Sequence, residues 1–255
     1  MRYEILGPFQ VVDEDGKHTI RARKIRVLLT VLLVRADQVV PVDQLITEIW
    51  GEAPPRRATA GLHVYISQIR KFLHRPGAED PVLTRPPGYL LRLGADELDL
   101  RRLELLVNQG RNDFRQGRHD QASAAFEEAL DLSADHLPDD LGNGPVLEGF
   151  HTWLRETRLE CVEMLMESRM MLGRHRELVG DLYQLTTEHP LREVLHRQLM
   201  LALYRSGRRA DALHAYQSAR RTLNEELGLE PCRDLQNLQR SILTSDHRLD
   251  LPIPA

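Results

Sequence analysis

The residues best suited to chemistry lie between Arg56 and Leu93. Within 58–74 the apolar residues recur at helical spacing and leave a second, narrow face that is polar and cationic. That face consists of His63, Ser67, Arg70, Lys71 and His74. Imidazole, hydroxyl, guanidinium and ammonium groups are the donors that contact phosphates and base edges in nucleic acids. A solvated helix surface can have the same composition, so the helix alone does not decide between the two interpretations.

The charge distribution favours a nucleic-acid partner. Residues 1–93 carry 14 Lys and Arg against 10 Asp and Glu, whereas residues 94–255 carry 20 against 28. The net charge is therefore +4 in the first segment and −8 in the second, although the whole chain is at −4. Phosphates respond to the local charge, so the first segment is the candidate for DNA binding.

The elements around this helix predict a small α+β domain. Residues 3–20 alternate apolar and polar with turns at Gly7-Pro8 and Asp15-Gly16, which predicts an antiparallel sheet. Helices are predicted over 22–36, 43–50 and 58–74, with an extended link at 39–41 and a loop at 51–57. Two short strands, 82–85 and 89–93, follow as a hairpin. A helix followed by such a hairpin suits insertion into the DNA major groove, with the hairpin touching the backbone or the minor groove.

From Glu97 onward the pattern is helical almost throughout. Loops are predicted at Gly117, 136–145, Gly173, Pro190, Gly207 and 228–231. Gly117, Gly173 and Gly207 are each followed by apolar residues at offsets of five, nine and twelve. These offsets, and the 34 residues between the last two glycines, are typical of tetratricopeptide helix pairs. A generic helical bundle is the alternative.

The sequence lacks the motifs that are typical of enzymes and metalloproteins. The chain has no phosphate-binding loop, no nucleophile elbow and no metal-binding spacing, so we expect neither an enzyme nor a cofactor or metal site. Cys161 and Cys232 lie far apart without a Cys-x-x-Cys motif, which is typical of reduced thiols. With no signal peptide and no long apolar run, we expect a cytoplasmic protein with no membrane contact.

The motifs resemble a known family. Leu62–Lys71 (LHVYISQIRK) resembles the recognition helix of OmpR/PhoB-type winged helices, and Gly88-Tyr89 resembles the start of their wing. The later chain resembles a bacterial transcriptional activation domain, most clearly at His189–Arg192, Leu199–Arg208 and Glu225–Pro231. The combination is similar to the Streptomyces antibiotic regulatory proteins (SARP family), which are pathway-specific activators of secondary-metabolite gene clusters.

The resemblance implies an α+β winged helix-turn-helix domain at 1–95, followed by an all-α tetratricopeptide-like activation domain at 96–255. It further implies binding to direct repeats near the promoter −35 region, as a homodimer or head-to-tail pair, and recruitment of RNA polymerase through its σ factor and α subunit. The loop Gly51–Arg57 would then face polymerase.

The residue roles follow from this resemblance together with the helix faces. We expect Thr59, His63, Ser67 and Arg70 to face the groove, with Arg70 reading a guanine edge. We expect phosphate contacts from a second set, which comprises Arg23, Lys24, Arg57, Lys71 and Arg85. Two alternatives stay open, namely a helical-repeat scaffold for protein partners and a repressor that shares the same DNA-binding features.

Overall fold

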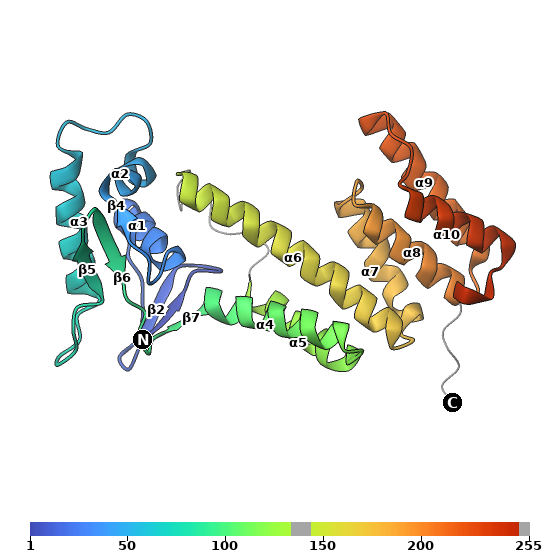
Figure 1. Cartoon of the computed structure of the whole chain (residues 1–255), viewed down its shortest axis with the longest axis horizontal. Coiled ribbons are helices and arrows are strands. Elements are labelled where there is room, and N and C mark those ends of the chain that lie inside the picture. Colours follow the sequence, from blue (N-terminus) through green and yellow to red (C-terminus); the bar gives the residue numbers. More distant parts are fainter. Residues whose placement is uncertain (134–143, 250–255) are drawn as a thin grey trace. The chain divides into compact units, whose positions relative to one another are not determined.

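The computed structural model describes residues 1–133 and 144–249 of the chain (Figure 1). Two compact units are present, one formed by Met1–Leu106 with Glu128–Leu159 and the other by Val107–Glu127 with the residues from Glu160 onward. The first unit therefore contains the predicted DNA-binding segment together with part of the helical segment. The limits of these two compact units differ from the domain boundary expected near residue 95. That domain boundary stays a prediction.

The first unit begins with a four-stranded sheet in the order β3-β2-β1-β7. Its strands are β1 (Arg2–Glu4), β2 (Gln10–Asp13), β3 (Gly16–His18) and β7 (Glu97–Leu98). The antiparallel pairs β1–β2 and β2–β3 confirm the sheet predicted for residues 3–20. Strand β7 pairs in parallel with β1, placing Tyr3 opposite Leu98. A strand of two residues is too short to show alternation, which explains why the sequence did not predict it.

Three helices, α1 (Arg23–Val34), α2 (Val42–Trp50) and α3 (Ala58–Phe72), form the core of this segment. Each packs against the other two. The side chains that meet between them are fully buried; they include Leu28, Leu32, Leu45, Leu62 and Ile66. Removing each such side chain from water stabilises the fold by roughly 1.5–3 kcal/mol. The apolar spacing of α3 therefore fixes which of its faces remains outside.

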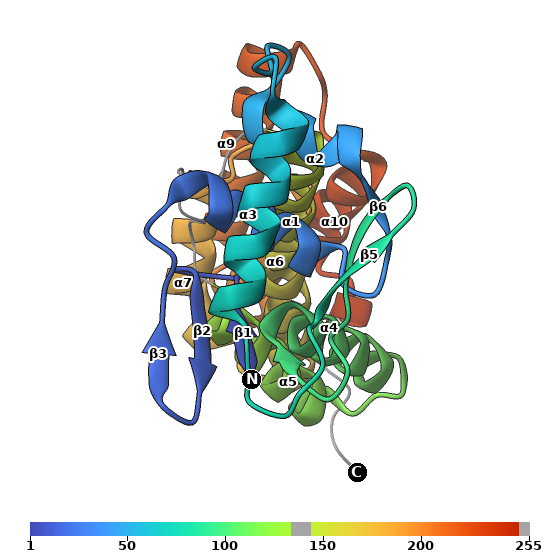
Figure 2. The ribbon, with the colours of Figure 1, turned by 90° about the vertical axis from the view of Figure 1, so that its left-hand side faces the viewer.

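A three-stranded sheet in the order β4-β6-β5 holds the hairpin. Its strands are β4 (Val40–Pro41), β5 (Val82–Arg85) and β6 (Gly88–Leu91), which confirms the predicted hairpin. A Cβ on Gly88 would lie 1.8 Å from the Val40 carbonyl oxygen, so only glycine allows β4 and β6 to approach this closely. Figure 2 shows α3 lengthwise with the β5–β6 hairpin beside it.

The rest of the described chain is helical. Its helices are α4 (Asp99–Arg115), α5 (His119–Leu132), α6 (Pro145–Met171), α7 (His175–Glu188), α8 (Glu193–Arg205), α9 (Arg209–Leu227), α10 (Arg233–Thr244) and the short 3-10 helix η2 (His247–Leu249). The predicted loops at Gly117, Gly173, Pro190, Gly207 and 228–231 fall between these helices. The loop predicted for 136–145 lies largely outside the described residues. None of the helices in the described part has the length and apolarity needed to span a membrane.

The three repeat glycines end their helices in the same way. Gly117, Gly173 and Gly207 have φ values of 72°, 79° and 78°, a left-handed conformation that glycine adopts without steric cost. In each loop the next residue's N–H donates to a carbonyl five residues back, for example from Arg208 to Leu203 at 2.9 Å. This is the Schellman motif.

Residues at two of the three shared offsets, five and nine, are buried, whereas at offset twelve Ala129 and Ala219 are buried and Leu185 is half-buried. Ala122, Phe126, Leu178, Leu182, Ala212 and Tyr216, at offsets of five and nine, are at most 5% exposed. Within the second unit α7 packs on α8, α8 packs on α9, and α10 packs against both α8 and α9. The winged helix-turn-helix and tetratricopeptide-like fold classes predicted from the sequence are thus confirmed.

Candidate nucleic-acid interface

The outward face of α3 carries most of the residues predicted to contact DNA. Thr59, His63, Ser67 and Lys71 are exposed along the helix, and His74 is exposed just beyond its end. The fifteen residues of α3 include no Asp or Glu. The helix therefore presents hydrogen-bonding and cationic groups with no carboxylate of its own to repel phosphates.

Three further residues share this face and were not singled out in the sequence. Ala60, Val64 and Gln68 are exposed, and Val64 is 53% exposed although the other large aliphatic residues of α3 are buried. Helical spacing alone places them beside His63 and Ser67, so the signal was present. A methyl, an isopropyl and a neutral amide group lack the charge, hydroxyl or imidazole that marks the other side chains of this face.

An aromatic contact holds the middle of α3 against α2. The Trp50 ring stacks on Tyr65 with centroids 5.8 Å apart, and Lys24 Nζ lies 5.3 Å from the Trp50 ring centroid. Lys24, at the start of α1, thus combines a cation–π contact with an exposed position. Arg23 beside it and Arg57 at the start of α3 are also exposed.

Arg70 makes several contacts within the DNA-binding segment. Its Nε and Nη2 donate to the Val82 carbonyl oxygen at 3.0 and 2.8 Å, and Nη2 also donates to Thr84 Oγ1 at 3.0 Å. The guanidinium also forms an ion pair with Asp80 at 3.0 Å. These bonds hold the guanidinium against β5. The contact of Arg70 with a guanine edge stays a prediction. The residue positions the hairpin against α3.

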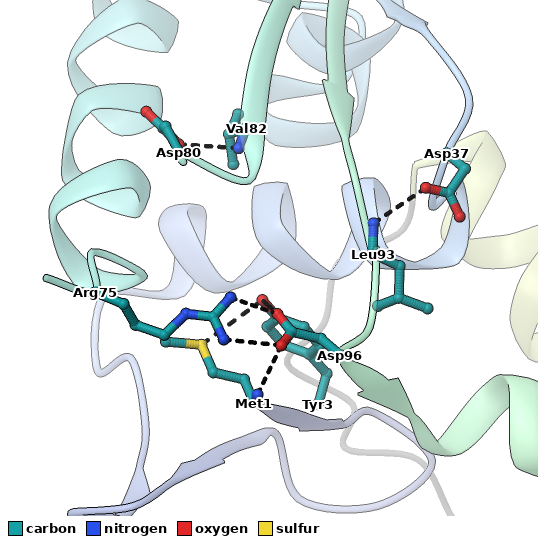
Figure 3. Close-up of polar contacts among 8 residues, drawn as sticks. All are labelled: Met1, Tyr3, Asp37, Arg75, Asp80, Val82, Leu93 and Asp96. Atoms are coloured by element: carbon teal, nitrogen blue, oxygen red, sulfur yellow. Dashed lines mark hydrogen bonds and ion pairs between the residues drawn. The ribbon is translucent and has the colours of Figure 1, made fainter. Parts of the chain in front are cut away.

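Asp80 completes the same connection from the hairpin side. Its Oδ1 accepts a hydrogen bond from the Val82 N–H at 2.9 Å (Figure 3). Val82 is thereby held through both of its backbone polar groups, one by Asp80 and the other by Arg70. Arg85 lies at the free end of β5, is exposed, and is carried on the hairpin that this contact orients.

The buried carboxylate of Asp96 connects the two ends of the DNA-binding segment. Asp96 accepts hydrogen bonds from the Met1 ammonium at 2.7 Å and from Arg75 at 2.8 and 2.9 Å, and Tyr3 donates to it at 3.3 Å (Figure 3). Burial acts to raise the pKa of Asp96, but the cationic donors outweigh it and the pKa is lowered. The cluster joins the first strand, the end of α3 and the entry to β7.

Two more buried carboxylates link the winged helix to the following helices of the same unit. Asp99 accepts from the N–H groups of Ile5 and Leu6 at 2.7 and 2.8 Å, and burial raises its pKa to about 6 against the lowering effect of these donors. Glu48 on α2 accepts from the Val146 N–H at 2.6 Å, at the start of α6. Burial raises the pKa of Glu48 as well. Neither link was predicted from the sequence.

The fold and this surface define a winged-helix DNA-binding protein with a helical-repeat region, and the comparisons with known proteins agree. Residues 17–91 match the family model "Transcriptional regulatory protein, C terminal", and residues 98–243 match "Bacterial transcriptional activator domain". The chain belongs to the Streptomyces antibiotic regulatory protein family of DNA-binding transcriptional activators. Within 1–133 and 144–249, no group of three or more His, Cys, Asp or Glu side chains is placed to hold a metal ion.

Individual relatives support this membership. The chain is 38% identical to regulatory protein DnrI of Streptomyces peucetius, covering 98% of this chain and 94% of DnrI. It is 32% identical to transcriptional regulator RedD of Streptomyces coelicolor, covering 97% and 72%. Regulatory protein AfsR of Streptomyces griseus is 35% identical, but the chain spans only 25% of its length.

A solved structure of EmbR from Mycobacterium tuberculosis, in complex with a low-affinity phosphopeptide, superposes with a TM-score of 0.90 at 33% identity. The match covers 99% of this chain and 66% of EmbR.

Proposed function

We propose that the chain activates transcription of a secondary-metabolite gene cluster by inserting α3 into the major groove of promoter DNA. The observation that carries this proposal is the exposed, acid-free face of α3 next to a hairpin that Arg70 and Asp80 hold in place. Thr59, His63 and Ser67 would face the groove, and Lys71 and His74 would lie at its edge. Arg23, Lys24, Arg57, Lys71 and Arg85 would neutralise phosphates and so position the protein without reading sequence.

We further propose binding to direct repeats near the promoter −35 region by a head-to-tail pair of protomers. Direct repeats place both protomers in the same orientation, whereas palindromic sites require two-fold symmetry. The loop Gly51–Arg57 is exposed at every position, which suits contact with the σ factor or α subunit of RNA polymerase. The acidic helical half would add contacts with other proteins. The chain would act by binding and would catalyse no reaction, and it would act in the cytoplasm, where promoter DNA lies.

A gel shift with the purified full-length chain and the promoter regions of a neighbouring gene cluster tests the DNA-binding half of the proposal. Affinity should fall linearly with salt on logarithmic axes, and Arg85→Ala should reduce the slope by about one. No binding at low salt would favour the helical-repeat scaffold instead.

Transcription with purified polymerase and σ factor tests the activation half. We expect the full-length chain to increase transcript from the promoter that it binds, and the increase to require that binding. A decrease in transcript at a bound promoter would identify a repressor.

A further inference from the structure

Val64 is an apolar side chain at the centre of a polar surface. It is 53% exposed, whereas the isobutyl and sec-butyl groups of Leu62, Ile66 and Ile69 in the same helix are fully buried. Single exposed apolar residues are common and need no special explanation. This one lies on the face of α3 that the proposed function places in the groove, between His63 and Ser67.

Gln68 lies one helical turn after Val64 and is also exposed. Residues four apart are neighbours on a helix surface, so the two side chains form one continuous strip. In the part of the chain that the structure describes, the Gln68 amide makes no hydrogen bond with another residue, in contrast to the guanidinium of Arg70. Both its carbonyl oxygen and its amino group are therefore available to a ligand.

These two groups match particular base edges in the major groove. Thymine presents a C5 methyl group, which makes apolar contacts, whereas adenine presents an N7 acceptor beside an N6 donor. A glutamine amide offers the complementary donor and acceptor and can bind adenine through both at once. The side chain best suited to guanine on this helix, Arg70, is held by Val82 and Asp80.

We propose that Val64 and Gln68 are the residues that determine sequence specificity, Val64 by contacting a thymine methyl group and Gln68 by pairing with an adenine. The inference rests on the proposed function, since it requires α3 in the major groove. Four residues of helix rise about 6 Å, and base pairs are spaced by about 3.4 Å. The thymine and the adenine should therefore lie within about two base pairs of each other in each half-site.

The test begins with selection of duplexes from a randomised pool by the full-length wild-type chain. The selected duplex is then remade with uracil for single thymines, which removes only the methyl group, and with 7-deazaadenine for single adenines, which removes only N7. One uracil position should weaken wild-type binding about fourfold. One 7-deazaadenine position should weaken it about tenfold.

Variants of Val64 and Gln68 then test which of the two residues contacts each base. Val64→Ala should bind the uracil duplex as well as the thymine duplex, and Gln68→Ala should lose its sensitivity to 7-deazaadenine, because each variant lacks one partner of the pair. Val39→Ala and Gln38→Ala make the same chemical changes at exposed positions in the link before β4. These controls should keep the wild-type sensitivity to both base analogues.

The possible failures are distinguishable. If the chain selects a defined duplex but Val64→Ala and Gln68→Ala keep the wild-type response to both analogues, the assignment to these residues is wrong and DNA binding stands. The same conclusion follows if no thymine or adenine in the selected duplex responds. If the chain selects no duplex at all, the proposed function fails and this inference fails with it.

Discussion

Arg70 and Arg85 carry the same charge on neighbouring elements but lie in different surroundings. Arg85 is exposed on β5, whereas Arg70 bonds to the backbone of β5 and to Asp80. The Nε and Nη2 of Arg70 already donate within the protein, and moving them to a base edge would leave the Val82 carbonyl oxygen unpaired. The contribution of Arg70 to DNA binding is therefore expected through the position of the hairpin.

Replacing Arg70 tests this positioning role. Arg70→Ala should lower the free energy of unfolding by about 1–2 kcal/mol, because hydrogen bonds from a charged donor are lost. It should weaken binding to the selected duplex and to random DNA by the same factor, as measured by gel shift. Arg92→Ala is the matched control, since Arg92, just after the hairpin, pairs with the exposed Glu79 just before it. A loss restricted to the selected duplex would show that Arg70 reads a base.

Asp99 predicts a pH dependence of stability. Its pKa of about 6 in the folded chain lies above the unfolded value of about 3.9, so the folded state binds more protons between these pH values. The contribution of Asp99 to stability is therefore fully present below about pH 4 and is lost as the pH rises through 6. The loss amounts to about 3 kcal/mol.

Denaturant unfolding of the wild type and of Asp99→Asn at pH 4 to 7 measures this contribution. The difference in unfolding free energy, wild type minus variant, should fall as the pH rises, because the asparagine does not titrate. Other carboxylates affect both proteins and cancel in the difference. Parallel pH profiles would show that Asp99 has the same pKa in the folded and unfolded chains.

At the scale of elements, the helical repeats depend on small residues where helices pack closely. Ala212 on α9 lies five residues after Gly207 and is fully buried. Ala212→Leu should overpack this contact and lower the unfolding free energy by roughly 1–3 kcal/mol. Ala210→Leu, two positions earlier on the same helix and exposed, should leave the thermal midpoint within about a degree. Equal midpoints for both variants would contradict the repeat packing.

Buried side chains and the contacts of Arg70 also hold the α3 helix and the β5–β6 hairpin together as one element. The buried stripe of Leu62, Ile66 and Ile69 fixes the rotation of α3 about its axis. Arg70 then ties its last turn to Val82. The outward strip of α3 and the exposed Arg85 are consequently held in fixed positions relative to each other. A protein that contacts both a groove and the adjacent DNA backbone requires this.

At the scale of the whole molecule, the DNA-binding and activating functions should be separable, although the first unit extends beyond residue 96. Asp99 lies past that point and satisfies the buried N–H groups of Ile5 and Leu6. A fragment of residues 1–96 lacks this carboxylate and strand β7, whereas a fragment of 1–106 keeps both. Leaving two buried donors unsatisfied costs about 1–3 kcal/mol each.

We therefore expect both fragments to bind DNA at low salt, with a lower melting temperature for 1–96. Neither fragment should stimulate transcription as the full-length chain does, because the proposed protein contacts of the helical half are missing. Thermal melts, gel shifts and purified transcription measure the three properties. Full activation by the 1–106 fragment would show that the helical half is dispensable, and equal melts would show that Asp99 contributes nothing to this unit.

The sequence by itself determined the elements and most of the exposed site. The apolar spacing of 58–74 and the turn at 86–88 are local patterns. The first specifies a helix and the second a hairpin, without any contact distant in the sequence. The three glycines at the ends of α4, α6 and α8 likewise identified the repeat, because a left-handed residue strongly favours glycine. The same spacing placed Thr59, His63, Ser67 and Lys71 outside.

Only the tertiary structure decided which side chains on that surface are free to bind. Arg70 is twelve positions from Val82, Asp99 is more than ninety from Ile5 and Leu6, and Glu48 is ninety-eight from Val146. Hydrogen bonds over such separations leave no periodic pattern in the sequence, since either partner alone looks like an ordinary charged surface residue. The fold brings these groups together, so that Arg70 is held against the hairpin while Val64 and Gln68 stay open to a ligand.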